Sequence, residues 1–311
     1  MLSRTANSLY WIGRYVERAE FTAKLIEATI RLDALSARPA GQGAWDSALL
    51  VAAADQDFAL TGETRTPLAI SRYLTLSPDN ANSVRSCLDA ARSNAKSVRT
   101  ALSRDAWEAI NRAWLGLRGR ASTGGSQATL GLVEQIRAET RGFEGALHRM
   151  LRNEAYAFIG LGAAMERADN TARLIDVKYH LLLPEGEKVG GPIDRDQWTT
   201  ILHTVSAVTA YRWLYSEGLK PWLVAELLCL RRELPRSLIA SSEEAIGHLN
   251  AIGKRTGLQG EADRLARVRH NALERTSIDA IFNQGLHEWL TAFIRENTRI
   301  HHAVGQQFRF S

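Results

Sequence analysis

Helix-breaking residues and long hydrophobic runs are scarce in this 311-residue chain. Its seven prolines leave two stretches, 79–183 and 236–311, without any. A proline inside a helix removes a backbone hydrogen bond and clashes with the preceding turn. Proline-free stretches of this length therefore favour a mostly helical protein. No run approaches about 18 uncharged apolar residues, so no membrane-spanning helix is expected.

Cysteine is almost absent, since Cys87 and Cys229 are the only two. Two cysteines cannot build a disulfide framework, and their spacing does not match a zinc site. We interpret them as two buried thiols in a reducing compartment. The first residues include charges and lack the apolar core of a signal peptide, so a cytoplasmic location is expected.

Charge of one sign is not clustered in the chain. The 39 Lys and Arg residues and 34 Asp and Glu residues give a net charge of +5, and the two signs are interleaved. A nucleic-acid binder more often carries a basic stripe with aromatic residues, so no nucleic-acid partner is expected. The 45% of hydrophobic residues is enough for a globular core and excludes disorder.

An internal repeat is the most informative feature that is present. Residues 17–27 read ERAEFTAKLIE and residues 166–176 read ERADNTARLID, with seven of eleven positions identical at an offset of 149. Weaker matches follow at offsets up to 154, namely Trp45 with Trp198, Ser83 with Ser237 and Gly131 with Gly285. Self-similarity at a fixed period indicates repeated structural units. We therefore predict one continuous body made of two pseudo-symmetric halves, 1–150 and 151–311.

Both copies of the repeat have the apolar period of a helix. Apolar residues recur in alternating steps of three and four from Leu9 to Ile30 and from Phe158 to Tyr179. This period is typical of a helix that presents one face to a bundle. The expected fold class is all-α, a helical bundle. Further helices are expected over 45–59, 80–100, 104–116, 127–152, 194–215, 220–232, 235–252, 260–275 and 277–306.

The repeated Glu-Arg pairs, Glu17-Arg18 and Glu166-Arg167, lie beside the apolar stripe, because neighbouring residues on a helix are about 100° apart. Arg18 shares its face with apolar residues seven positions before and after it, so this face is expected to contact a second helix. A buried charge needs a partner. The planar guanidinium group suits a carboxylate or a phosphate. If the halves pack about a two-fold axis, the two pairs meet across it.

The first copy has one cation more than the second. Arg14 precedes Glu17 by three residues, so two arginines lie within reach of Glu17, whereas Ala163 stands at the matching position of the second copy. Three interpretations stay open for the Glu-Arg pairs. They form a structural ion-pair network that ties the halves together, a ligand site built on their arginines, or a solvated charged face.

Other candidates come from the same segments. Thr22 and Thr171 follow the two arginines by four residues, where a helical Thr commonly bonds back to its own backbone. Asn170 adds a polar group in the second copy only. The candidate residues for binding a substrate or partner are Arg14, Glu17, Arg18, Thr22, Glu166, Arg167, Asn170 and Thr171. Catalytic residues are unknown, with Glu17 and Glu166 as candidates for a general base.

Metal and cofactor signatures do not stand out. His301 and His302 are adjacent and diverge on a helix, and no Glu-x-x-His motif is present, so they are interpreted as solvated or structural. No phosphate loop, dinucleotide fingerprint or nucleophile motif is found. The sequence therefore predicts neither a metal nor a cofactor.

Four blocks of the chain resemble the bacterial Alpha-E family in order. They are LSRTANSLYWIGRYVERAEFTAKLIEATIRL (2–32), SPDNANSVRSCLDAARSNAKSVR (77–99), RDAWEAIN (104–111) and MERADNTARLIDVKYHLLLP (165–184). The family's motif residues map onto Ser3, Arg4, Tyr10, Arg14, Glu17, Arg18, Thr22, Glu166, Arg167, Asp169, Thr171 and Arg173. One departure is Gly162-Ala163, where family members often carry Gly-Arg. Another is Arg152 to Tyr156, where they often carry Arg-Asp-Glu-Gly-Trp.

The resemblance implies an all-helical domain that works beside a circularly permuted ATP-grasp protein, with a transglutaminase-like peptidase as a possible second partner. ATP-grasp enzymes join a carboxylate to an amine through an acyl-phosphate. The expected role is thus in ATP-dependent synthesis or modification of a peptide or amino-acid conjugate. The alternatives are a stand-alone enzyme that acts on the ligase product and a purely structural helical scaffold.

Overall fold

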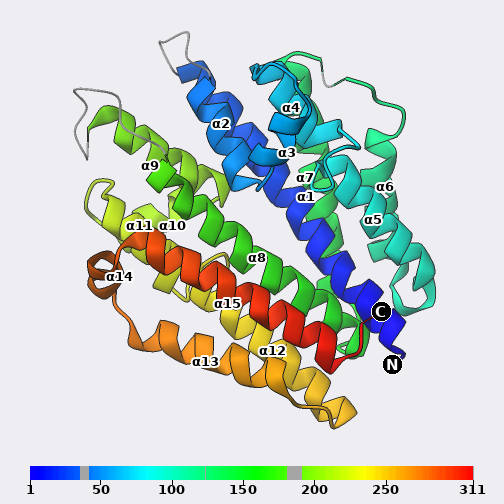
Figure 1. Cartoon of the computed structure of the whole chain (residues 1–311). Coiled ribbons are helices and arrows are strands. Elements are labelled where there is room, and N and C mark those ends of the chain that lie inside the picture. Colours follow the sequence, from blue (N-terminus) through cyan, green and yellow to red (C-terminus); the bar gives the residue numbers. More distant parts are fainter. Residues whose placement is uncertain (36–41, 123, 181–190, 311) are drawn as a thin grey trace.

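The structure, a computed structural model, describes residues 1–35, 42–122, 124–180 and 191–310, and no strand occurs among them. Figure 1 shows helices only, in an all-α arrangement. The α-helices of the described chain are α1 (Ser3–Leu35), α2 (Gln42–Val51), α3 (Asp55–Leu60), α4 (Pro67–Leu76), α5 (Val84–Ser97), α6 (Arg104–Leu117), α7 (Ser126–His148), α8 (Glu154–His180), α9 (Pro192–Thr204), α10 (Val208–Leu214), α11 (Pro221–Leu230), α12 (Leu238–Thr256), α13 (Glu261–Arg275), α14 (Ile278–Gln284) and α15 (Leu286–Gln307). A short 3₁₀ turn, Arg99–Ala101, lies between α5 and α6.

The two long helices α1 and α8 carry the repeated segments and pack against each other in the middle of the molecule (Figure 1). Their backbones approach most closely at a pair of glycines. A Cβ atom on Gly13 would lie 2.0 Å from the carbonyl oxygen of Ile159, and one on Gly162 would lie 2.0 Å from that of Tyr10. Only glycine permits this approach, so the helices are held close enough for their charged side chains to reach across.

The remaining helices gather on the two sides of this central pair. In Figure 1, α5 lies along α1, and α12 lies along α8. The apolar core forms two clusters along the central helices, one around Ile26 and Ile175 and one around Leu9 and Leu161. Each cluster contains residues from before and after position 150, so the halves share their cores.

Three expected helices are each divided in two, which corrects the sequence prediction. The segment 45–59 is broken at Ala53 (φ 51°), the segment 194–215 at Ser206 (φ 59°), and the segment 277–306 at Gly285 (φ 98°). A positive φ ends a right-handed helix. Alanine and serine rarely adopt it, so nothing in the local sequence marked the first two breaks.

The prediction also missed α4 and misplaced the start of α5. Helix α4 begins with Pro67 at its first position, and the Thr66 side chain accepts a hydrogen bond from the backbone N–H of Ala69. These are standard helix-start features. Helix α5 begins at Val84, four residues after the expected start, and the side chain of its cap Ser83 accepts from the N–H of Ser86. The sequence also predicts breaks between helices at 37–43 and 184–192, where proline and glycine occur, and these segments fall largely outside the described residues.

Matched local features recur along the chain at the offsets of the repeat. Pro67 and Pro221 begin α4 and α11, and Ser83 and Ser237 cap α5 and α12. The left-handed breaks at Ala53 and Ser206 follow α2 and α9 in the same way. The two-fold relation between the halves itself stays a prediction.

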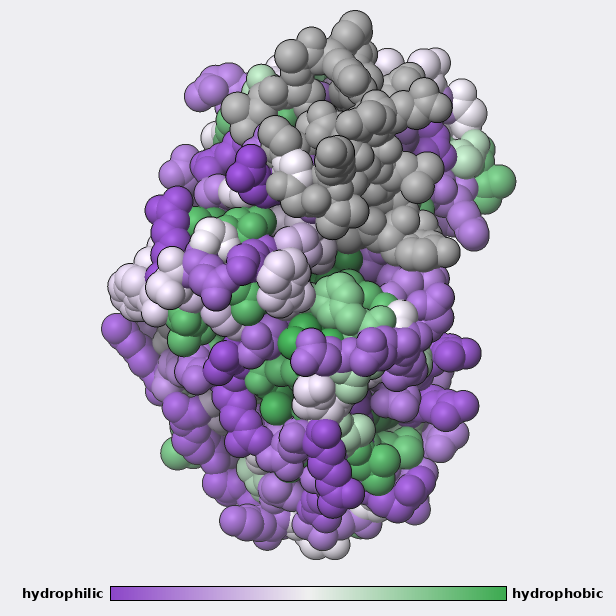
Figure 2. All heavy atoms as spheres, turned by 90° about the vertical axis from the view of Figure 1, so that its left-hand side faces the viewer, coloured by the Kyte–Doolittle hydropathy of each residue, from purple (hydrophilic) through white to green (hydrophobic). Residues whose placement is uncertain are grey.

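The surface is mainly hydrophilic where it can be viewed. Figure 2 shows the face on the left of Figure 1, with hydrophobic residues in small groups among hydrophilic ones. Across the described ranges, no helix combines the length and the hydrophobicity that crossing a bilayer requires.

Candidate functional site

Glu166 on α8 is held by two arginines of α1. Its Oε2 accepts a hydrogen bond from Arg14 Nε at 2.7 Å, and its Oε1 accepts one from Arg18 Nε at 2.6 Å. Arg18 Nη2 also donates to Oε2 at 3.0 Å, so Arg18 binds the carboxylate with two nitrogens. Glu166 is 2% exposed. The solvated-face interpretation is therefore wrong for this residue.

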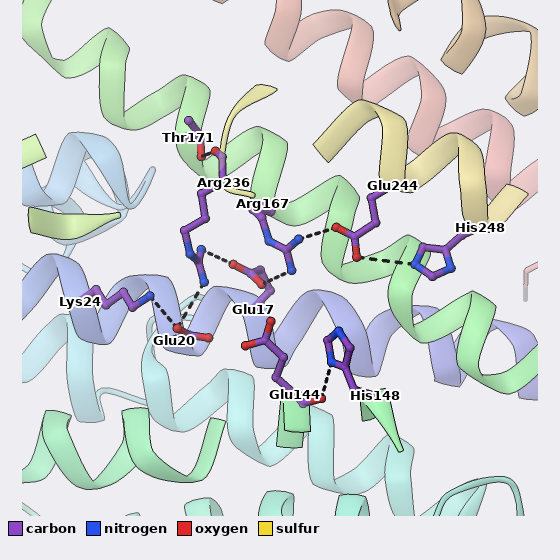
Figure 3. Close-up of polar contacts among 10 residues, drawn as sticks. All are labelled: Glu17, Glu20, Lys24, Glu144, His148, Arg167, Thr171, Arg236, Glu244 and His248. Carbon is purple, nitrogen blue, oxygen red and sulfur yellow. Dashed lines mark hydrogen bonds and ion pairs between the residues drawn. The ribbon is translucent and has the colours of Figure 1, made fainter. Parts of the chain in front are cut away.

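Glu17 on α1 is held in the reverse direction, as Figure 3 shows. Its Oε2 accepts from Arg167 Nη2 of α8 at 3.2 Å, and its Oε1 accepts from Arg236 Nη1 at 2.6 Å. The expectation that Arg14 and Arg18 surround Glu17 is thus wrong. Both arginines reach Glu166 instead, because the close approach of the backbones brings the α8 carboxylate between them.

Each buried carboxylate has two guanidinium groups, but the second one comes from a different place in each case. Ala163 replaces Arg14 in the second copy, and Arg236 supplies the missing cation there. The residue of the first copy that matches Arg236 in the repeat is Asn82. Its Oδ1 accepts a hydrogen bond from Arg18 Nη1 at 2.6 Å. Sequence reasoning missed Arg236, whose only signal was its place just before Ser237, the match of Ser83.

The electrostatics keep both carboxylates ionised. Burial raises the pKa of Glu166, but Arg18 and Arg14 outweigh burial and lower the pKa to about 2. Burial likewise opposes the charge on Glu17, and Arg236 and Arg167 outweigh it, so the pKa of Glu17 is lowered. A general-base Glu that works near neutral pH needs a raised pKa. The shifts run in the opposite direction to the one that the general-base hypothesis requires.

Four of the candidate residues line one small cavity of about 140 Å³, here called the Asn170 cavity. They are Arg18, Thr22, Glu166 and Asn170, and Asp169 and Arg173 line it as well. Asn170 is 6% exposed, and its Nδ2 has no hydrogen-bond partner within the described chain. An unpaired buried amide nitrogen is costly, which marks this cavity as a place where a hydrogen-bond acceptor fits.

Glu17 and Arg167 line a different space, a narrow cleft of about 40 Å³, and Figure 3 labels both residues with Glu244 and His248, which also line it. Arg167 Nη1 donates to Glu244 Oε2 at 2.5 Å, and His248 Nε2 lies 3.7 Å from Glu244 Oε1. Glu244 and His248, both on α12, were not found from the sequence, because no motif connects α12 with the repeat helices. The two Glu-Arg pairs therefore do not open into one common cavity.

The remaining candidates have structural contacts. Thr171 donates to the backbone carbonyl of Arg236 at 2.9 Å, not to its own helix as expected, and so fixes the chain ahead of α12. His301 Nδ1 lies 2.9 Å from the Tyr10 hydroxyl. Burial, together with Arg14, lowers the pKa of His301 to about 4. Within the ranges that the structure covers, no group of His, Cys, Asp and Glu has a metal-binding arrangement. Cys87 and Cys229 are buried free thiols.

Comparison with known proteins gives one match. The model of a family described as a predicted alpha-helical domain with a conserved ER motif covers residues 1–308. The two repeated Glu-Arg pairs, Glu17-Arg18 and Glu166-Arg167, exchange ion pairs between α1 and α8. Neither a curated protein nor a solved structure matches the chain. The match spans nearly the whole sequence, and the chain therefore belongs to the Alpha-E family.

Proposed function

We propose that this Alpha-E protein works with an ATP-grasp ligase and holds a carboxylate-bearing peptide or amino acid in the Asn170 cavity. The ligase partnership rests on the family resemblance, and the substrate class rests on the chemistry of the cavity. The main supporting observation is that Asn170, whose buried Nδ2 has no partner among the described residues, lines a cavity that Arg18 and Arg173 also line. Amide and guanidinium N–H groups are suitable donors for a carboxylate.

The charged residues act in this proposal by positioning, not by proton transfer. Glu166 binds Arg18 with two hydrogen bonds and fixes the plane of its guanidinium group. Asp169 Oδ2 accepts from Arg173 Nε at 2.7 Å and holds the second guanidinium at the cavity wall. An entering carboxylate would meet donors that are already oriented, which reduces the entropy lost on binding.

Asn170→Asp tests the cavity, because it replaces the unpaired amide by a carboxylate of the same shape. We expect KM for the carboxylate substrate in the reconstituted ligase reaction to rise about tenfold or more through repulsion between like charges. Asn283→Asp, at an exposed position of α14, makes the same change of charge and serves as the matched control. Equal KM values for the two variants would rule out carboxylate binding in this cavity.

The partnership has its own test. The Alpha-E protein and the ATP-grasp protein encoded beside it are co-expressed and passed over a size-exclusion column. We expect them to elute together. Clean separation at micromolar concentration would contradict the partnership. Carboxylate binding in the Asn170 cavity would then be tested by direct titration of the Alpha-E protein alone.

A structural scaffold is the second candidate function. It is favoured because the buried carboxylates already have arginine partners on every oxygen. Both oxygens of Glu17 and both oxygens of Glu166 accept hydrogen bonds from arginine. Arg18→Ala separates the two functions. A lower melting temperature with unchanged ligase activity supports the scaffold, and an unchanged melting temperature with lost activity supports substrate binding.

We also propose that the chain arose by duplication of one helical unit, with halves 1–150 and 151–311. The offsets of the matched features support this proposal, as does the reciprocal contact of Gly13 and Gly162. The paired exchange, in which each half supplies a glutamate to an arginine of the other, points the same way.

A further inference from the structure

A second cavity, here called the Lys24 cavity, lies between α1, α7 and the turn that joins α9 to α10. Its volume is about 410 Å³, within the usual range for small-molecule sites. Three cationic side chains line it, Lys24 and Arg31 from α1 and Arg137 from α7, together with the imidazole of His203 from α9. Ser206 adds a hydroxyl group from the turn, and Thr209 lines the cavity at the start of α10. It shares no lining residue with the Asn170 cavity.

Positive charge is in excess in the Lys24 cavity. Glu27 is the one carboxylate among the described residues that line it. Glu27 accepts hydrogen bonds from Arg31, at 2.6 Å, and also from Arg137. Lys24 Nζ forms an ion pair at 2.7 Å with Glu20, which does not line the cavity. Glu20 also forms an ion pair with Arg236 at 3.2 Å (Figure 3). One lining carboxylate thus faces three lining cations.

The pKa shifts reflect the same imbalance. Burial lowers the pKa of Lys24, and the nearby charge of Arg236 lowers it further. Burial and Arg141 lower the pKa of Arg137. In contrast, Glu166 outweighs burial and raises the pKa of Arg18. Burial is the main cause of both shifts, and the carboxylates near Lys24 and Arg137 do not offset it. Arg137 Nε is also buried without a hydrogen-bond partner among the described residues.

We propose that the Lys24 cavity binds the phosphate group of a small phosphorylated molecule. The three lining cations outnumber the lining carboxylate by two, and Glu20, the partner of Lys24, is shared with Arg236. This excess of positive charge suits a phosphate dianion better than a single carboxylate. Arginine forks and a lysine ammonium group are the usual phosphate ligands, and the Ser206 hydroxyl can donate to a remaining oxygen. The basic groups line a concave space, which suits a small molecule rather than a nucleic-acid strand.

The position of the cavity in the repeat gives independent support. Lys24 stands at the repeat position of Arg173, and Ser206 at that of Ala53, and both of those residues line the Asn170 cavity. The same place in the unit therefore forms a cavity twice. The Lys24 cavity is larger than the Asn170 cavity, and its lining cations outnumber its lining carboxylate. In the Asn170 cavity the lining arginines and carboxylates are equal in number. It requires neither the ligase partnership nor carboxylate binding in the Asn170 cavity.

Thr209 offers a test that spares the ion pairs. It is exposed in the first turn of α10, where glutamate is compatible with a helix start. Thr209→Glu adds a negative charge at the cavity, and Thr209→Gln adds the same volume without charge. Isothermal titration of the full chain with pyrophosphate, in a buffer without phosphate, should show binding for the wild type and for Thr209→Gln. Thr209→Glu should weaken it about tenfold or more.

Three results would overturn the proposal. They are the absence of wild-type binding up to about 10 mM pyrophosphate, equal affinity of the Glu and Gln variants, and binding of succinate as tight as that of pyrophosphate. Because no ligase is present, failure here leaves the proposed function untouched. Titration with ATP and with phosphoserine then separates a nucleotide from a phosphorylated amino acid as the source of the phosphate.

Discussion

At the scale of single residues, the molecule depends on two buried glutamates that are each bound by two arginines. Removing a charged group from water costs several kcal/mol, and attraction to the partner offsets this only with good geometry. The short bonds from Arg14 and Arg18 to Glu166 provide that geometry. The whole network can contribute little net stability and still be costly to break, because breaking it leaves buried charge without a partner.

Glu166→Gln should therefore be strongly destabilising. The variant keeps the volume but leaves two guanidinium groups without a counter-charge, and the expected loss is about 3–5 kcal/mol in the free energy of unfolding. Urea denaturation followed by circular dichroism measures it. Glu63→Gln removes a carboxylate from an exposed pair with Arg72 and should leave the midpoint almost unchanged. If both variants unfold at the same urea concentration, the network does not hold α1 and α8 together.

Acid should weaken the wild type through the same residue. The pKa of Glu166 is about 2 in the folded protein against an ordinary value of 4.5. A lowered pKa stabilises the fold above the ordinary value, and the stabilisation is lost as the pH falls toward the folded value. We expect ~3 kcal/mol to disappear between about pH 5 and pH 2. Urea midpoints at several pH values should fall less for Glu166→Gln than for the wild type, and parallel curves would contradict this assignment.

At the scale of elements, the α1–α8 crossing determines which charges meet. The glycines at the crossing bring each backbone against the other, so there is no space for a methyl group at either position. The apolar period of both helices was readable, but the helix caps at Ser83 and Ser237 were not predicted. The breaks at Ala53 and Ser206 were not, because the surrounding structure imposes a conformation that these residues do not prefer.

Gly162→Ala should disturb the crossing. The new Cβ atom would lie 2.0 Å from the Tyr10 carbonyl oxygen, so the helices must separate, at a cost of about 1–3 kcal/mol. Gly145→Ala is the matched control, because a Cβ there meets nothing within 4 Å on α7. It should stabilise the helix by about 0.5–1 kcal/mol. Thermal denaturation should shift in opposite directions for the two variants, and a shift in the same direction would argue against a tight crossing.

At the scale of the whole molecule, the two halves complete each other. Both core clusters contain residues from either side of position 150. Each half also supplies a glutamate to an arginine of the other, and Arg236 reaches back from the second half to Glu17. A half by itself would expose the apolar face of its long helix and leave its buried charges unpaired.

The fragments 1–150 and 151–311 should consequently fail to fold alone. We expect each to lack a cooperative thermal transition and to bind a hydrophobic dye, and we expect co-expression to restore a soluble complex with helical circular dichroism. The intact chain should unfold in one cooperative step. Cooperative melting of either fragment by itself would show that the halves are independent domains.

The sequence by itself determined the all-helical class, the membership of the family and the residues that deserved attention. Apolar spacing and scarce proline specify helices locally, and the repeated Glu-Arg motif can be identified in the sequence without a structure. The partner of each charge was decided only by the tertiary structure. Arg14 lies at helical spacing to Glu17 yet binds Glu166, and Arg236 joins Glu17 from far along the chain. Local spacing permits many ion pairs, whereas the close crossing of two particular helices selects among them.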